Sequence, residues 1–244
     1  MLRGLLLPLG LLSVFWSLTA LPSFRRTTPA REVTARIIAD ERFKTGALNQ
    51  MLTRIEAEPA PPIQQPELWL ADVLIRLRTA EEAMQQKTLE EADREVEAAE
   101  HKLIAALHLS PTDSLLWLLL YSVETTRNGF DPKTLSYLDR SYLAGPHEGW
   151  IALRRNRLSL AVFPVLGDWT RQATVSEFSE MVDADFIEEA GTNLMGVGWA
   201  QRERLLAALR DVDVSSKTSL LKRLLADGIN LKIPGIEHNE RPWR

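Results

Sequence analysis

The chain contains no cysteine. This absence excludes disulfide bonds, thiol nucleophiles and cysteine-ligated metal ions. Histidine is scarce, and its 4 copies do not form a metal-binding pattern. His101 and His108 are too far apart along one helix to share an ion, and His147 and His238 fall in expected loops. We therefore expect no metal and no cofactor.

Catalytic and nucleotide-binding motifs are also missing. The sequence has neither Gly-x-Ser-x-Gly nor His-Glu-x-x-His, and its Gly-rich stretch at 191–198 lacks Gly-Lys-Ser/Thr and a preceding strand. Glu177 with Glu180, and Asp183 with Asp185, have spacings that arise by chance on most soluble helices. The net charge of -4 argues against nucleic-acid binding. We predict that the protein is not an enzyme and binds no nucleic acid.

What the sequence has instead is helical periodicity. It recurs from Glu32 to Leu225, whereas strand-like segments are few, so the expected fold class is all-α. The length of 244 residues allows one large or two small domains. We predict a transmembrane signal-anchor at 1–24, a spacer and helical arm at 25–62, helical hairpins at 63–163, a C-terminal helical region at 164–229 and an irregular tail at 230–244. The Pro-rich segment 59–62 is a stiff linker that ends the arm.

The segment from Gly4 to Phe24 carries no charge and is long enough to cross a bilayer, which needs about 20 apolar residues. A cleaved signal peptide is the competing interpretation. The small-x-small cleavage pattern is poor at Ala20, however, and Pro22 would hinder cleavage. A buried core helix is a third interpretation, which the basic residues directly behind the segment disfavour. We therefore predict an uncleaved membrane anchor.

Basic residues on the two sides of this segment bear on its orientation. Arg3 lies before it, and Arg25, Arg26 and Arg31 follow it, which slightly favours a cytoplasmic main domain. Long domains that follow a signal-anchor cross the membrane largely regardless of such charges. We expect a single-pass protein of the bacterial inner membrane whose main domain is periplasmic.

The stretch 99–117 organises the rest of the chain. It predicts the end of one amphipathic helix, a turn at Pro111 and a second helix capped by Thr112 or Asp113. Residues 115–121 are apolar around the whole helix and too few to cross a membrane. We expect them to form the central core helix, with its tryptophan fully buried.

This stretch resembles the tetratricopeptide repeat, a helical hairpin of about 34 residues with the pattern W-x2-L-G-x2-Y, then A-x3-F, then Pro. The matching residues are Ala99, Leu103, Ala106 and Pro111 in one repeat, and Trp117, Leu120, Asp131, Pro132, Leu135, Leu138, Tyr142, Gly145 and Pro146 in the next, which ends before Trp150. Tyr121 and Glu124 depart from the pattern, and the small Ala after Pro132 is missing. The resemblance covers residues 88–163. It implies antiparallel helix pairs stacked as a short solenoid that binds protein partners.

Asp131 with Pro132 is an N-cap and first-turn pair, which predicts a helix start. Two further positions carry the capping-box spacing that marks helix starts, Thr88 with Glu91 and Thr174 with Glu177. The first precedes an apolar series at Leu89, Ala92, Val96, Ala99, Leu103 and Ala106. This series is also a heptad seam, so a short coiled coil competes with repeat packing as its role.

A basic cluster lies on the helix expected at 149–163. Arg154, Arg155 and Arg157 belong to it, and Arg140 lies on the preceding helix. The residues expected to face inward on this helix are Trp150, Leu153, Leu158, Ala161 and Val162. The arginines are a candidate surface for an acidic partner protein, an anionic glycan or lipid headgroups. The competing interpretation is a solvated face paired with local carboxylates.

Together these features predict a membrane-anchored helical-repeat protein that mediates protein–protein interactions, with envelope or membrane proteins as partners. An anchor followed by a degenerate repeat is similar in layout to small accessory proteins of bacterial envelope polysaccharide assembly or export. Two other hypotheses remain open. One is an all-helical envelope glycan-cleaving enzyme that uses Glu177 or Glu180, and the other is a structural oligomer that associates through the seam from Leu89 to Ala106.

Overall fold

The computed structural model describes residues 2–44, 46–57, 65–86 and 88–236. Within these ranges the chain forms α-helices, short 3-10 helices and turns, and no β-strand. The all-α prediction is therefore confirmed. The chain divides into two compact units, Met1–Pro111 (unit 1) and Thr112–Arg244 (unit 2). The division falls inside the expected hairpin region 63–163, so the two helices of the stretch 99–117 belong to different units.

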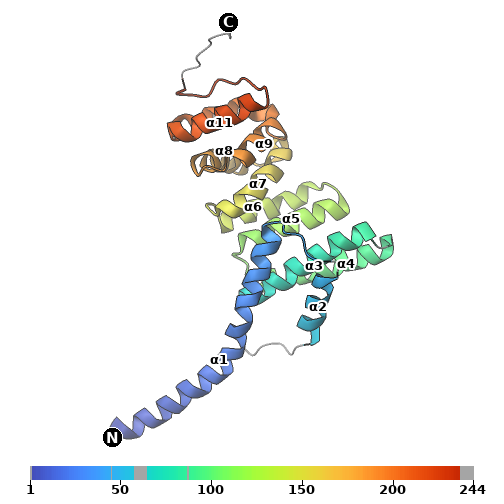
Figure 1. The fold of residues 1–244 in the computed structure, drawn as a ribbon, viewed down its shortest axis with the longest axis vertical. Coiled ribbons are helices and arrows are strands. Elements are labelled where there is room, and N and C mark those ends of the chain that lie inside the picture. The colour runs from blue at the N-terminus through green and yellow to red at the C-terminus, as the bar shows by residue number, and fades with distance from the viewer. Residues whose placement is uncertain (1, 45, 58–64, 87, 237–244) are drawn as a thin grey trace. The chain divides into compact units, whose positions relative to one another are not determined.

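Unit 1 is organised around one central helix, α3. It contains α1 (Leu2–Ile38), α2 (Ala47–Ala57), α3 (Pro66–Gln86) and α4 (Leu89–Leu109). α1, α2 and α4 each pack against α3, and α3 and α4 lie side by side in Figure 1. The core includes Ile37, Leu48, Leu52, Val73, Leu74 and Ile75. Ala92, Ala99, Leu103 and Ala106 of the α4 seam are also buried, so packing within the unit covers most of the seam.

The predicted transmembrane helix is wrong for the part of the chain that the structure describes. No helix among these residues is both long enough and apolar enough to cross a membrane. In the described part of this stretch, Pro8, Gly10, Ser13, Ser17 and Thr19 interrupt the series of large apolar side chains. The side chains of residues 1–7, 22, 23, 25 and 26 are not among those described. The expectation of a single-pass inner-membrane protein is corrected accordingly.

The spacer expected behind the apolar segment is helical. α1 continues through residues 23–31 and ends at Ile38. Arg31 in this part donates to Glu67 of α3 at 2.5 Å, which ties the second half of α1 to the unit. The Pro-rich linker predicted at 59–62 lies outside the described residues.

Unit 2 contains two helix pairs followed by a smaller group of helices. Its elements are α5 (Ser114–Asn128), η1 (Pro132–Thr134), α6 (Leu135–Ala144), α7 (Gly149–Ala161), η2 (Phe163–Val165), α8 (Asp168–Asp183), α9 (Ile187–Met195), η3 (Trp199–Gln201), α10 (Arg202–Ala207), η4 (Ala208–Asp211) and α11 (Val214–Ala226). α5 packs on α6 and α7 on α8, and the pairs meet because α5 contacts α7 and α6 contacts α8 (Figure 1). α9, α10 and α11 pack on α8. The resemblance to tetratricopeptide repeats itself stays a prediction.

Three predicted helix starts are confirmed. The Thr88 hydroxyl accepts from the backbone N–H of Glu91, and the Glu91 carboxylate accepts from that of Thr88, each at 3.4 Å. The Asp113 carboxylate accepts a backbone N–H of the first turn of α5 at 3.1 Å. Asp131 caps η1 in the same way at 2.9 Å, with Pro132 as the first residue of that helix. These contacts satisfy N–H groups that a helix start leaves without a partner.

The apolar stretch of α5 lies in the core of unit 2, which confirms the prediction of a core helix. Its buried residues are Leu115, Leu116, Leu118, Leu120 and Tyr121. Trp117 differs from the expectation because it is only half-buried. Its ring stacks on Tyr137 of α6 with 6.1 Å between centroids, and the guanidinium of Arg140 lies 5.9 Å from its centroid. Trp117 therefore lies at the edge of the contact between α5 and α6.

Two leucines of α6 provide a matched test of this packing, because Leu138 is 0% exposed and Leu143 is 65% exposed. We predict that Leu138→Ala lowers the free energy of unfolding by about 2–5 kcal/mol, since it removes buried apolar surface and leaves a cavity. Leu143→Ala should change it by less than about 0.5 kcal/mol. Urea unfolding followed by tryptophan fluorescence measures both variants. Equal losses would contradict the orientation of α6.

Candidate functional site

The buried polar side chains of unit 2 converge on Arg155 of α7. Its side chain is 0% exposed, and that of its partner Glu177 of α8 is 2% exposed. Nε and Nη2 of the guanidinium lie 2.8 and 2.7 Å from Oε1 of the carboxylate. Two charges taken out of water are tolerated only when they pair and when their remaining donors and acceptors are also bonded. The surroundings of this pair meet that requirement.

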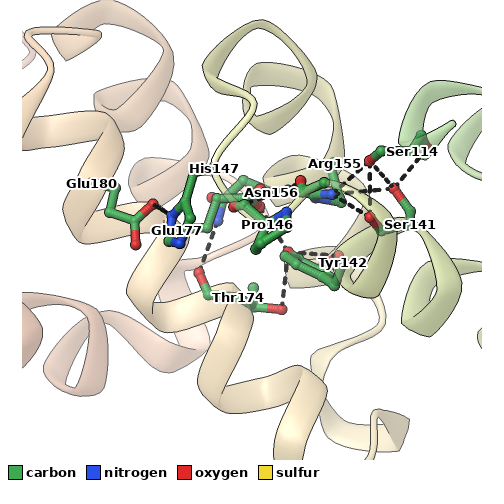
Figure 2. Close-up of polar contacts among 12 residues, drawn as sticks. Ser114, Ser141, Tyr142, Pro146, His147, Arg155, Asn156, Thr174, Glu177 and Glu180 are labelled. Atoms are coloured by element: carbon green, nitrogen blue, oxygen red, sulfur yellow. Dashed lines mark hydrogen bonds and ion pairs between the residues drawn. The ribbon is translucent and has the colours of Figure 1, made fainter. Parts of the chain in front are cut away.

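The other donors of the guanidinium bind α5, α6 and the turn after α6 (Figure 2). Nη1 donates to the Ser114 hydroxyl at 3.0 Å, to the Ser141 carbonyl at 2.9 Å and to the Ser141 hydroxyl at 3.2 Å. Nη2 donates to the Gly145 carbonyl at 3.0 Å and lies 3.4 Å from the Pro146 carbonyl. One side chain thus cross-links α5, α6, the turn and α8.

The turn at the end of α6 has room only for glycine at position 145. A Cβ atom at Gly145 would lie 2.8 Å from Cβ of Ser114, closer than real Cβ contacts, so a larger residue would push the turn away from α5. The last carbonyl groups of a helix lack intrahelical partners and carry partial negative charge. Arg155 supplies a charged donor to the carbonyls of Ser141 and Gly145 at the end of α6.

Tyr142 of α6 completes the bonding of the carboxylate. Its hydroxyl donates to Oε2 of Glu177 at 2.7 Å, and the hydroxyls of Ser159 and Thr174 lie 3.2 and 3.3 Å away. The ring of Tyr142 also faces the guanidinium of Arg155, with 4.1 Å between Cζ and the ring centroid. Arg155 therefore holds Oε1 of the carboxylate, and Tyr142 holds Oε2.

Asn156, the residue after Arg155, extends the bonding to α9. Its Nδ2 donates to the Thr174 carbonyl at 2.9 Å, and its Oδ1 accepts from Nδ2 of Asn193 at 3.2 Å. All three residues are buried. We call the whole set the Arg155 network; its members are Ser114, Ser141, Tyr142, Arg155, Asn156, Ser159, Thr174, Glu177 and Asn193.

The electrostatics of the network follow from its enclosure. Burial raises the pKa of Glu177 above its ordinary value of 4.5, while the charge of Arg155 and the hydrogen bonds from Tyr142 and Arg155 oppose the shift. Burial, with the nearby Glu177, also raises the pKa of Tyr142 well above its ordinary value. The hydroxyl therefore keeps its proton and donates a hydrogen bond to Glu177. Every N–H group of the Arg155 guanidinium has an acceptor. This arrangement holds helices together and leaves the guanidinium no N–H group for a ligand.

The structure separates the four arginines that the sequence presented as one candidate surface. Arg155 faces the interior. Arg154 and Arg157 lie on the exposed side of α7, and Arg140 is exposed on α6 beside Trp117. Of the four arginines of the candidate surface, Arg140, Arg154 and Arg157 are therefore exposed.

The inward face of α7 is the feature that the sequence pattern missed. Its buried residues are Ile151, Ala152, Arg155, Asn156, Ser159 and Leu160. Trp150, expected inside, is 41% exposed, and Ala161 is exposed as well. Because three polar residues occupy the buried face, a search for an apolar stripe selects the wrong side of the helix. The available signal was the spacing of Ile151, Arg155 and Ser159, which places them on one face.

α8 also begins earlier than expected, at Asp168 with Gly167 as its N-cap. Thr174 therefore lies inside the helix, and its spacing to Glu177 is not a capping box. The same spacing puts both side chains on the inward face. There the Thr174 hydroxyl donates to the Thr170 carbonyl at 2.7 Å.

Glu177 and Glu180, one of the two candidate carboxylate pairs, lie in different surroundings. Glu177 is enclosed in the Arg155 network, whereas Oε2 of Glu180 lies 3.2 Å from Nδ1 of His147 on the exposed side. Asp183 accepts from the backbone N–H of Asp213 at 3.1 Å. Within the described ranges, no three His, Asp or Glu side chains are placed to hold a metal ion.

Comparison of the sequence with protein-family models and with curated proteins, and of the fold with solved structures, gave no match.

Removing the cation of the buried pair tests the network. We predict that Arg155→Met lowers the free energy of unfolding by about 3–5 kcal/mol, because Glu177 is left buried without its partner. Arg155→Met combined with Glu177→Met should lose less than the sum of the two single variants. Arg157→Met, on the exposed side of the same helix, should change stability by less than about 0.5 kcal/mol. Additive losses in denaturant unfolding would contradict the pairing.

The raised pKa of Glu177 predicts a pH dependence of stability. A carboxyl with a pKa above 4.5 in the folded state contributes stability that is fully present below its unfolded pKa and is lost as pH rises through its folded pKa. Glu177→Gln cannot ionise. The stability of the unchanged chain relative to this variant should therefore fall as pH rises above 4.5. Glu180→Gln is the control, and a relative stability that rises with pH would refute the prediction.

Proposed function

We propose that this chain is a helical interaction protein that binds an acidic surface of a partner protein through the exposed arginines of unit 2. The observation that carries this proposal is the division of the arginines on α7. Arg155 anchors the helix from inside, and Arg154 and Arg157 lie on its outer side. A helix fixed on one face presents charged side chains on the other at low cost in conformational entropy, which favours binding.

The edge between α5 and α6 has the composition of a binding surface. Trp117 is half-buried there, and the exposed Arg140 lies over its ring. Tryptophan and arginine are enriched among the residues that contribute most to protein–protein affinity. Arginine also binds carboxylates through two parallel hydrogen bonds, which suits an acidic protein surface.

The other hypotheses gain less support. Glycan cleavage requires a pair of carboxyl groups that reach the substrate. Glu180 lies on the exposed side, but Glu177 is 2% exposed and bonded to Arg155. An oligomer through the α4 seam requires an exposed seam, and Ala92, Ala99 and Leu103 are buried within unit 1. The layout shared with envelope polysaccharide accessory proteins included a membrane anchor, so we do not carry that assignment forward.

Charge reversal on α7 tests the proposal. The full-length chain, carrying an affinity tag, is crosslinked in its own cells, and captured proteins are quantified by mass spectrometry. We predict that Arg154→Glu with Arg157→Glu reduces recovery of the main partner several-fold, because like charges then face its acidic surface. Circular dichroism confirms that the variant is folded.

The matched control is Lys133→Glu with Lys222→Glu, which makes the same change in net charge at two other exposed positions of unit 2. This control should leave recovery unchanged. The proposal is wrong if both variants reduce recovery equally, since net charge would then be the cause. It is also wrong if neither variant has an effect.

A further inference from the structure

The first half of α1 exposes large apolar side chains along its length. The exposed residues are Leu9, Leu11, Leu12, Val14, Phe15, Trp16, Leu18 and Leu21, at 46% to 70% of their full exposure. With 3.6 residues per turn, these positions are distributed around the whole circumference of the helix. In Figure 1 this part of α1 extends beyond α2, α3 and α4. Unit 1 therefore leaves this surface, the α1 apolar surface, largely uncovered.

The hydroxyl groups on the same stretch of α1 are already hydrogen-bonded within the helix. The hydroxyls of Ser13, Ser17 and Thr19 donate to the carbonyls four residues earlier, at 2.8–2.9 Å. No residue from Gly4 to Phe24 is charged. What covers the surface must therefore be apolar, because the surface offers no charge and its hydroxyl donors are already used.

The amount of exposed area is that of a stable interface. Phe15 and Trp16 together expose on the order of 300 Å², and six aliphatic side chains add to this. The total exceeds the few hundred Å² of the apolar patches usual on monomers. It approaches the roughly 800 Å² that one partner contributes to a standard protein–protein interface.

We propose that two or more copies of this chain associate by packing their α1 apolar surfaces against one another as a helical bundle. A second copy brings a surface that is equally long, uncharged and apolar, and helices from several copies cover each other on more than one side. A single groove on a different protein would cover one side only.

Two basic residues in the second half of α1 are paired within unit 1. Arg31 is bonded to Glu67 at 2.5 Å, and Arg36 to Glu41 at 2.8 Å. Two of the basic side chains that α1 helices would bring together are thus already paired within their own chain. This proposal is independent of the partner surface on α7, because it involves only unit 1.

The absence of cysteine makes a site-specific test possible. Leu12→Cys places a unique thiol on the α1 apolar surface, and Leu109→Cys places one at the end of α4, where Leu109 is 52% exposed. Under mild oxidation in detergent-free buffer, Leu12→Cys should form a disulfide-linked dimer several-fold faster than Leu109→Cys. Equal rates would overturn the proposal.

Sedimentation velocity provides the second measurement. The unchanged full-length chain should sediment as an assembly, and Leu12→Glu with Phe15→Glu should sediment as one copy. Met84→Glu with Leu109→Glu, at 57% and 52% exposure, is the matched control and should leave the assembly intact. A monomeric unchanged chain would refute the proposal. So would a chain that is monomeric in buffer and binds phosphatidylcholine vesicles through α1, since lipid would then cover the surface.

Discussion

The ion pair between Arg155 and Glu177 is the constraint on which unit 2 depends. Removing two charges from water costs several kcal/mol for each ion, and only a nearly complete set of bonded neighbours offsets that cost. Ser114, Ser141 and Tyr142 supply those neighbours from α5 and α6. Because each contributes to the same small group, their energies are coupled, and the loss of one weakens the others. The two helix pairs of unit 2 are thereby held by a polar contact within an apolar core.

Unit 1 shows a different means of assembly. α3 lies among α1, α2 and α4, and the buried side chains at its centre are mostly aliphatic. Apolar contacts of this kind are non-directional, so they tolerate small shifts between helices. Most of its ion pairs, such as Arg78 with Asp40 and Glu81, are more exposed, and Asp72 is the buried carboxylate among them, paired with Arg76 and Lys102. The two units therefore differ in how sharply their sequences define the position of each helix.

Sequence patterns predicted the parts of this fold that depend on local rules. The helix starts at Thr88, Asp113 and Asp131 were found because a cap is a contact within one turn. The core position of α5 was found because an apolar helix of that length must be buried. The inward face of α7 was not found, since Arg155 is buried only because α5, α6 and α8 together satisfy it. No pattern within α7 contains those partners, so the site required the tertiary structure. The transmembrane helix was inferred from the composition of one segment, and among the described residues no helix is long and apolar enough to be one.

The guanidinium of Arg155 also specifies the rotational and axial position of α7. An apolar helix face offers several packings of similar energy, because one leucine replaces another when a helix slides by a turn. Such a shift would carry Arg155 away from the carbonyls of Ser141 and Gly145 and place an unpaired charge among apolar side chains. A lysine, with three donors on one atom, does not reproduce these bonds in four directions. Alternative arrangements of unit 2 are therefore destabilised by an unpaired buried charge, and the outer face of α7 points in one defined direction.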